Sequence, residues 1–236
     1  MTTIQDQSKK GRYLVLSEHA FRLKNRAEAG RLLAQGLKEF NLDHPVICAV
    51  PRGGLPVAVP IACELNAALD MVLIKKLGAP GNPEFAIGTV DEDGRVYLKD
   101  YASKISDEDY IQGVAQLKWQ ELQQEYKPLR ERIPAQKLEG RDVVIVDDGV
   151  ATGSSFMSAV MVVRNYNPKR IIAAIPVSPA ETFRAISSMV DAAVAVMVPE
   201  EFAGGVGFYY QNFEQVQPEE IDALINQYQK CHDKAT

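Results

Sequence analysis

The sequence predicts an α/β protein whose doubly wound, mainly parallel sheet is covered by helices on both faces and carries a small hood. Two observations support this prediction. Short, almost wholly apolar runs alternate with longer segments of helical periodicity, and several runs end directly in loops of Gly, Pro, Ser or Asp. Strands that are apolar throughout are typical of parallel sheets buried on both faces. A chain of 236 residues has room for one such domain.

The expected elements follow one another along the chain after a polar segment, residues 1–24, that we expect to be a loose N-terminal arm. The remainder, residues 25–236, is expected to be one domain. Buried strands are predicted by the apolar runs at 46–50, 71–74, 143–146, 171–175 and 193–198. Helices are predicted at 26–40, 55–68, 106–132, 156–165, from Pro179, and at 218–229.

The hood is predicted around residues 77–100 and 199–215. The runs FAIGTV at 85–90 and RVYLK at 95–99 flank the turn-rich tetrapeptide DEDG, and this arrangement predicts a β-hairpin. The second part of the hood is the C-terminal segment at 199–215.

Composition excludes several classes of protein. The net charge of -5 and the lack of basic runs beyond Lys9-Lys10 and Lys75-Lys76 argue against nucleic acid as a partner. No apolar stretch reaches the ~18 residues of a membrane span, so we expect a soluble, cytoplasmic protein without membrane contact. Three cysteines without CxxC spacing predict no disulfide or zinc framework, with Cys48 and Cys63 in the core.

The most informative segment is VVIVDDGVATGSS at residues 143–155. Four apolar residues run into Asp147 and Asp148, and a loop of small residues then leads into a helix. In a doubly wound fold this loop lies at the carboxyl end of a strand, where its N–H groups and the helix N-terminus can surround a phosphate. The carboxylates suit sugar hydroxyls, reached directly or through a magnesium-bound water. The segment therefore predicts a ribose 5-phosphate site.

This segment resembles the signature of the type I phosphoribosyltransferases that binds 5-phosphoribosyl-1-pyrophosphate (PRPP). PRGG, KLGAPGNPE and VDDGxATG resemble in particular the stand-alone bacterial members of undefined acceptor. The resemblance implies a transferase of nucleotide metabolism that uses Mg²⁺, moves the phosphoribosyl group of PRPP to a nitrogen of a nucleobase or related heterocycle, and releases pyrophosphate. It implies that Asp147 and Asp148 hold the metal, through water. The PRPP-binding residues that it implies are Asp147, Asp148, Ala151, Thr152, Gly153, Ser154 and Ser155.

The segment AVPRGG at 49–54 lies where the family has its pyrophosphate loop, often with a cis peptide that here would join Pro51 and Arg52. Glycine backbones can turn N–H groups toward an anion, and arginine adds charge-assisted donors. The pyrophosphate-binding residues implied are Arg52, Gly53, Gly54, Lys75 and Lys76. A solvated pair stays open as the alternative for the two lysines.

The stretch LGAPGNPEF at 77–85 fits the flexible lid of the family, which closes over PRPP and excludes water. Glu84 is its only carboxylate. We take Glu84 as a catalytic candidate together with Lys76, Asp147 and Asp148; an exposed glutamate without a role is the alternative.

Acceptor binding is assigned to the segment PEEFAGGVGFYY at 199–210, where Phe202, Phe208 and Tyr209 could stack on a flat ring. Core packing is the alternative for these aromatic residues. Two departures weaken a 6-oxopurine assignment: Ala151 replaces the aspartate of the hypoxanthine-guanine enzymes, and Ser178 is the nearest match to their purine-reading lysine.

A PRPP-sensing regulator of the same fold, without turnover, is the leading alternative function. For the oligomeric state, a homodimer is one alternative that the sequence leaves open. The partners expected are therefore PRPP and a small heterocyclic acceptor.

Overall fold

A computed structural model describes residues 12–17 and 19–233. The chain divides into two compact units. The larger comprises the residues up to Met71 and from Ala135 onward, and the smaller comprises Val72–Pro134.

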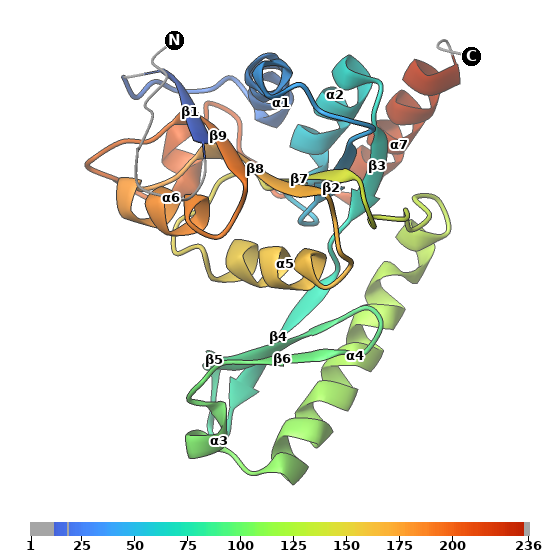
Figure 1. Cartoon of the computed structure of the whole chain (residues 1–236), viewed down its shortest axis with the longest axis vertical. Coiled ribbons are helices and arrows are strands. Elements are labelled where there is room, and N and C mark those ends of the chain that lie inside the picture. Colours follow the sequence, from blue (N-terminus) through green and yellow to red (C-terminus); the bar gives the residue numbers. More distant parts are fainter. Residues whose placement is uncertain (1–11, 18, 234–236) are drawn as a thin grey trace. The chain divides into compact units, whose positions relative to one another are not determined.

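The larger unit is built on a six-stranded, wholly parallel sheet (Figure 1). Its order is β1-β9-β8-β7-β2-β3. The strand bounds are β1 Arg12–Ser17, β2 Val46–Ala49, β3 Ala68–Met71, β7 Asp142–Val146, β8 Arg170–Val177 and β9 Ala192–Met197. Every residue of β2, β7 and β9 is buried, because helices cover both faces of the sheet.

Five α-helices and two 3₁₀ turns accompany this sheet in the described part of the larger unit. Figure 1 shows α1 and α2 over one face and α5 and α6 over the other. The bounds are α1 Arg26–Leu37, η1 Lys38–Phe40, α2 Leu55–Leu65, α5 Ser154–Arg164, α6 Ala180–Ser187, η2 Val206–Tyr209 and α7 Pro218–Asp233. The predicted doubly wound α/β fold is thereby confirmed.

The direction of winding reverses between β2 and β7, which lie side by side at the centre of the sheet. From β2 the chain passes through α2 to β3 at one edge, and from β7 it passes through α5, β8 and α6 toward the other. Such a reversal opens a crevice at the carboxyl ends of the two strands, where ligands of doubly wound proteins bind.

The prediction of a loose arm over residues 1–24 is wrong for Arg12–Ser17, which form β1 and pair in parallel with β9. The run RYLVLS is β-prone but has only Leu14 buried, so its apolar signal is weak. Residues 1–11, including Lys9-Lys10, and Glu18 lie outside the described residues.

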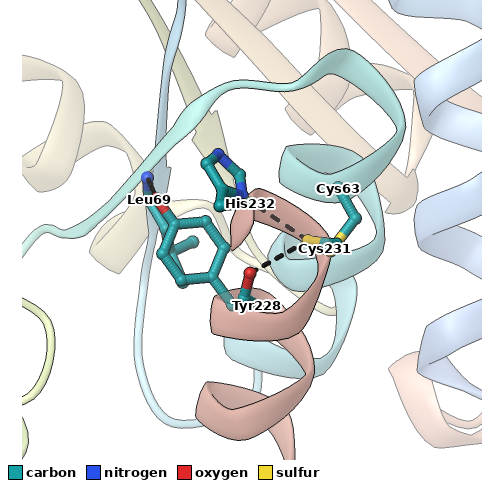
Figure 2. The surroundings of a disulfide bond; sticks show 5 residues. All are labelled: Cys63, Leu69, Tyr228, Cys231 and His232. Atoms are coloured by element: carbon teal, nitrogen blue, oxygen red, sulfur yellow. Dashed lines mark hydrogen bonds between the residues drawn. A yellow bond between two sulfur atoms is a disulfide. The ribbon is translucent and has the colours of Figure 1, made fainter. Parts of the chain in front are cut away.

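A disulfide joins Cys63 of α2 to Cys231 of α7, against the prediction that the cysteines form none (Figure 2). The two residues are 168 positions apart, so only the packing of α7 on α2 brings them together. Tyr228 of α7 also accepts a hydrogen bond from the backbone N–H of Leu69 in β3, at 3.0 Å (Figure 2). The C-terminal helix is thus attached to the edge of the sheet. Cys48 is buried in β2 and takes no part in a disulfide.

The smaller unit is a three-stranded antiparallel sheet of order β4-β5-β6, along which α4 packs (Figure 1). Its elements are β4 Ile74–Ala79, β5 Asn82–Asp91, β6 Val96–Leu98, α3 Ala102–Ile105 and α4 Glu108–Arg130. The predicted hairpin is confirmed as β5 and β6. Its turn is closed by Asp91, whose Oδ1 accepts hydrogen bonds from the N–H groups of Asp93 and Arg95.

The stretch 77–85, in which we expect the flexible lid, lies in β4 and β5, which pair with each other as far as Ala79 and Asn82. A register shift around Gly78 interrupts the ladder, which explains why the sequence lacks the alternation of a regular strand.

Across the described residues, no helix is long and apolar enough to cross a membrane.

Candidate functional site

The two loops singled out in the sequence meet at the switch point of the sheet. Ala49 and Val146 are paired at the ends of β2 and β7, and Val50 extends the contact by donating its N–H to the Val146 carbonyl at 2.8 Å. The segment PRGG then leads into α2, and the segment 147–153 leads into α5. The predicted cis peptide between Pro51 and Arg52 is present.

The acidic pair stands directly against the PRGG loop. A Cβ placed on Gly53 would lie 2.2 Å from Oδ2 of Asp148, so the position has room for glycine alone as the two loops are now arranged. Asp147 folds back on the chain, and its Oδ1 accepts the N–H of Asp148 at 2.9 Å. One carboxylate oxygen of each residue remains to accept from a ligand.

Arg26, the first residue of α1, is the main residue of the site that the sequence reasoning missed. Its Nε donates to Oδ2 of Asp148 at 2.8 Å, and only 11% and 16% of the two side chains is exposed. Its Nη1 donates to the Glu214 carbonyl at 2.8 Å, and its guanidinium lies 3.9 Å from the centre of the Phe213 ring. The spacing of Asn25 and Glu28 predicts a helix start here, but nothing in the sequence indicates the partner of Arg26.

Tyr210 is the second missed residue. Its buried hydroxyl donates to the backbone carbonyl of Asp148 at 2.6 Å, and its ring stacks on Phe213 at 4.8 Å. The segment that carries both rings is fixed by backbone pairing: Leu23 donates its N–H to Tyr209 and accepts from Gln211. Tyr210 therefore supports the acidic pair, a role that the sequence did not suggest.

Burial and neighbouring charges change the pKa values of Asp147 and Asp148. Burial raises the pKa of Asp147 well above its ordinary value, and the neighbouring Asp148 charge raises it further. Burial also raises the pKa of Asp148, although the Arg26 guanidinium opposes that rise. The carboxylates are therefore poised to gain from a ligand that supplies hydroxyl donors or positive charge.

The predicted phosphate loop ends at the N-terminus of α5. Gly153 precedes the helix with φ = 79°, a left-handed conformation that suits glycine, and no side chain caps the helix. The first N–H groups of α5 therefore have no partner within the helix. Thr182 of α6 holds the loop by donating its hydroxyl to the Ala151 carbonyl at 2.9 Å. This arrangement of N–H groups and dipole suits a phosphate.

The three aromatic residues proposed for the acceptor have different surroundings. Tyr209 is 3% exposed, stacks on Phe202 at 5.1 Å between ring centres, and accepts a hydrogen bond from the N–H of Ala203. Phe208 is exposed, and Phe202 is half-buried. Core packing is thus the role that the contacts give Tyr209, while Phe202 and Phe208 keep ring surface for a ligand. Ser178 is fully buried and donates to the Pro179 carbonyl.

Lys75, Lys76 and Glu84 belong to the smaller unit. Lys75 lies 2.8 Å from Glu125 and 3.7 Å from Glu121 of α4, so its charge is already balanced by carboxylates. Lys76 follows it in β4 and points to the other face of the strand, where it is exposed. Glu84 is exposed in β5. Of the two lysines, Lys76 is the better candidate for an anionic ligand.

The donor set around the acidic pair is compatible with magnesium carried by a substrate. Within the described ranges, no cluster of three or more His, Cys, Asp or Glu side chains could hold a metal by itself. Mg²⁺ commonly keeps several waters and binds one or two carboxylates together with substrate phosphates. Asp147 and Asp148 supply hard oxygen atoms of that kind and number.

Comparison with known proteins agrees with this geometry. A family model described as the phosphoribosyl transferase domain matches residues 22–212. Two curated proteins of Mycobacterium tuberculosis, strains CDC 1551 / Oshkosh and H37Rv, are each 34% identical over 207 residues, and their names describe them provisionally as phosphoribosyl transferases. The match covers 86% of this chain and 46% of each relative, so the chain spans about half the length of these proteins.

The crystal structure of TT1426 from Thermus thermophilus superimposes with a TM-score of 0.80 and 40% identity. The superposition covers 88% of this chain and 99% of the other. The family resemblance inferred from the two loops is thus confirmed. The pairing of β2 with β7, the two loops that follow them and the match over residues 22–212 place the chain in the phosphoribosyl transferase domain family.

Proposed function

We propose that the protein transfers the 5-phosphoribosyl group of PRPP to a ring nitrogen of a small heterocycle, with release of pyrophosphate. The observation that carries this proposal is the contact between the loops. Asp148 of the predicted ribose 5-phosphate loop lies against Gly53 of the PRGG loop, which supports adjacent places for a phosphate, a diol and a pyrophosphate.

Each part of PRPP would have its own partner in the larger unit. The 5-phosphate would accept hydrogen bonds from the N–H groups of residues 151–155, at the start of α5. The ribose hydroxyls would donate to the carboxylates of Asp147 and Asp148. The pyrophosphate would bind the N–H groups of Gly53 and Gly54 and the side chain of Arg52. Arg52 is exposed at the surface of the loop.

The reaction forms a bond between the acceptor nitrogen and ribose C1 while the bond from C1 to the pyrophosphate oxygen breaks. Pyrophosphate leaves with the electron pair, and the nitrogen loses its proton. The chain would contribute position and electrostatics, since groups held in place ahead of the reaction need no reorganisation. Lys76 and Glu84 are candidates for charge neutralisation and for accepting the proton.

Asp147 and Asp148 would hold Mg²⁺, through water, next to the ribose hydroxyls. When bound, the ion neutralises charge that develops on the departing pyrophosphate. The two carboxylates suit an ion that arrives with PRPP and keeps most of its ligands from water and phosphate.

The test is a screen of nucleobases and related heterocycles with PRPP and Mg²⁺, in which released pyrophosphate is measured. A true acceptor gives release that depends on both the heterocycle and PRPP, and Asp147→Asn with Asp148→Asn abolishes it. Binding of PRPP without release for any acceptor would instead favour a PRPP sensor of the same fold.

A further inference from the structure

We propose that Arg26 is a positioning residue, which holds the Asp148 carboxylate in the orientation that accepts ribose hydroxyls and couples it to the C-terminal segment 209–214. The inference rests on the proposed function, since it concerns the ribose part of the same site. Arg26 lies outside the PRGG loop and outside the segment VVIVDDGVATGSS.

The contacts of Arg26 divide between the acidic pair and the C-terminal segment. Nε donates to Oδ2 of Asp148, Nη1 donates to the Glu214 carbonyl, and the guanidinium carbon lies over the ring of Phe213. A planar guanidinium can make these three contacts at once, and an ammonium group cannot. Arg26 therefore determines where the Asp148 carboxylate lies, as well as partly balancing its charge.

The start of α1 holds Arg26 itself in place. The Asn25 side chain accepts the N–H of Glu28 at 3.0 Å, and the Glu28 carboxylate accepts the N–H of Lys24 at 2.5 Å. These two bonds fix the first turn on both sides of Arg26. Gly53 of the PRGG loop also lies against this carboxylate and leaves no room for a Cβ. Asp148 thus contacts both α1 and the PRGG loop.

Arg22 offers a matched control. It lies four residues before Arg26, and its Nε and Nη2 donate to the Tyr210 carbonyl at 3.1 and 2.6 Å. It therefore supports the same C-terminal segment, and none of its hydrogen bonds in the described structure goes to the acidic pair. Loss of Arg22 tests loosening of the segment alone, whereas loss of Arg26 also releases Asp148.

The experiment compares wild type, Arg26→Met, Arg26→Lys and Arg22→Met by calorimetry with four probes: inorganic phosphate, pyrophosphate, ribose 5-phosphate, and PRPP with Mg²⁺. Arg26→Met should weaken ribose 5-phosphate and PRPP by about tenfold or more, the scale of one charge-assisted hydrogen bond. Phosphate and pyrophosphate should change much less, because they have no diol to donate to Asp148. Arg26→Lys should recover part of the loss, and Arg22→Met should resemble wild type.

Two results would overturn the inference while the proposed function stands. In one, Arg26→Met binds ribose 5-phosphate and PRPP as tightly as wild type; in the other, it weakens all four probes equally, as a purely structural residue would. If Arg26→Met does not fold, Phe213→Leu removes the ring beneath the guanidinium and should show the same selective loss at smaller size. Wild-type protein that binds neither PRPP nor ribose 5-phosphate would overturn the proposed function, and this inference with it.

Discussion

Gly53→Ala is the substitution whose effect follows most directly from the geometry. The added Cβ would lie 2.2 Å from Oδ2 of Asp148, and ordinary contact begins at 3.4 Å. The carboxylate must therefore move by about 1.2 Å or the loop must shift by as much. A shift of that size would disrupt the 2.8 Å hydrogen bond that Oδ2 accepts from Arg26, because such bonds keep their geometry only over a few tenths of an ångström. A charge-assisted hydrogen bond contributes about 1.5–3 kcal/mol, which corresponds to roughly a tenfold to a hundredfold change in affinity.

The assay is calorimetric titration of ribose 5-phosphate and of PRPP with Mg²⁺, alongside thermal unfolding. Gly113→Ala is the control, because a Cβ on that exposed residue of α4 meets nothing within 4 Å. Alanine at such a helical position should raise stability by about 0.5–1 kcal/mol and leave ligand binding unchanged. Folded Gly53→Ala protein that binds ribose 5-phosphate as wild type does would refute the placement of Asp148.

Three further predictions follow from other parts of the chain. Arg52→Ala should weaken pyrophosphate and PRPP by about 1.5–3 kcal/mol in calorimetry and ribose 5-phosphate far less; equal losses would make Arg52 structural. Guanine and hypoxanthine should be poor substrates because Ala151 and buried Ser178 supply no partner for a 6-oxopurine, and turnover above ~10⁴ M⁻¹s⁻¹ would contradict this. Burial raises the pKa of Asp142, but the Arg170 guanidinium and the Asp43 N–H outweigh it and hold that pKa below 3.8. The charged form of Asp142 therefore stabilises the fold above about pH 3.8, and this stabilisation is lost as the pH falls through the lowered pKa. In thermal unfolding, Asp142→Asn should therefore be less stable than wild type at pH 7, and the difference in stability should shrink below pH 3.8.

The sequence predicts the fold well where strands are apolar throughout. The run VICAV and the run VVIV became β2 and β7 with the loops at their carboxyl ends, because strands buried on both faces leave a continuous apolar signal. The edge strand β1 leaves no such signal, since it has only Leu14 buried. The sequence of 77–85 lacks the alternation that indicates a hairpin, because the pairing of β4 with β5 shifts register at Gly78.

The sequence predicts those parts of the candidate site that lie within one continuous segment, but not the contacts between distant segments. Asp147, Asp148 and Gly53 belong to recognisable segments, whereas Arg26 reaches Asp148 across 122 residues and Tyr210 across 62. Such contacts arise when distant segments pair, here Leu23 with Tyr209 and Gln211. The disulfide between Cys63 and Cys231 has the same origin, since it depends on helix packing rather than on cysteine spacing.

The most direct test of PRPP binding is calorimetric titration of PRPP with Mg²⁺ into wild-type protein and into the Asp147→Asn, Asp148→Asn double variant. Asparagine keeps the shape of each side chain and removes the charge that accepts the ribose hydroxyls and attracts the metal. The proposed site predicts at least about a tenfold loss of affinity, with the thermal unfolding of the variant still cooperative. Unchanged binding of PRPP by the folded double variant would contradict the assignment of the loop after β7 as the ribose 5-phosphate site.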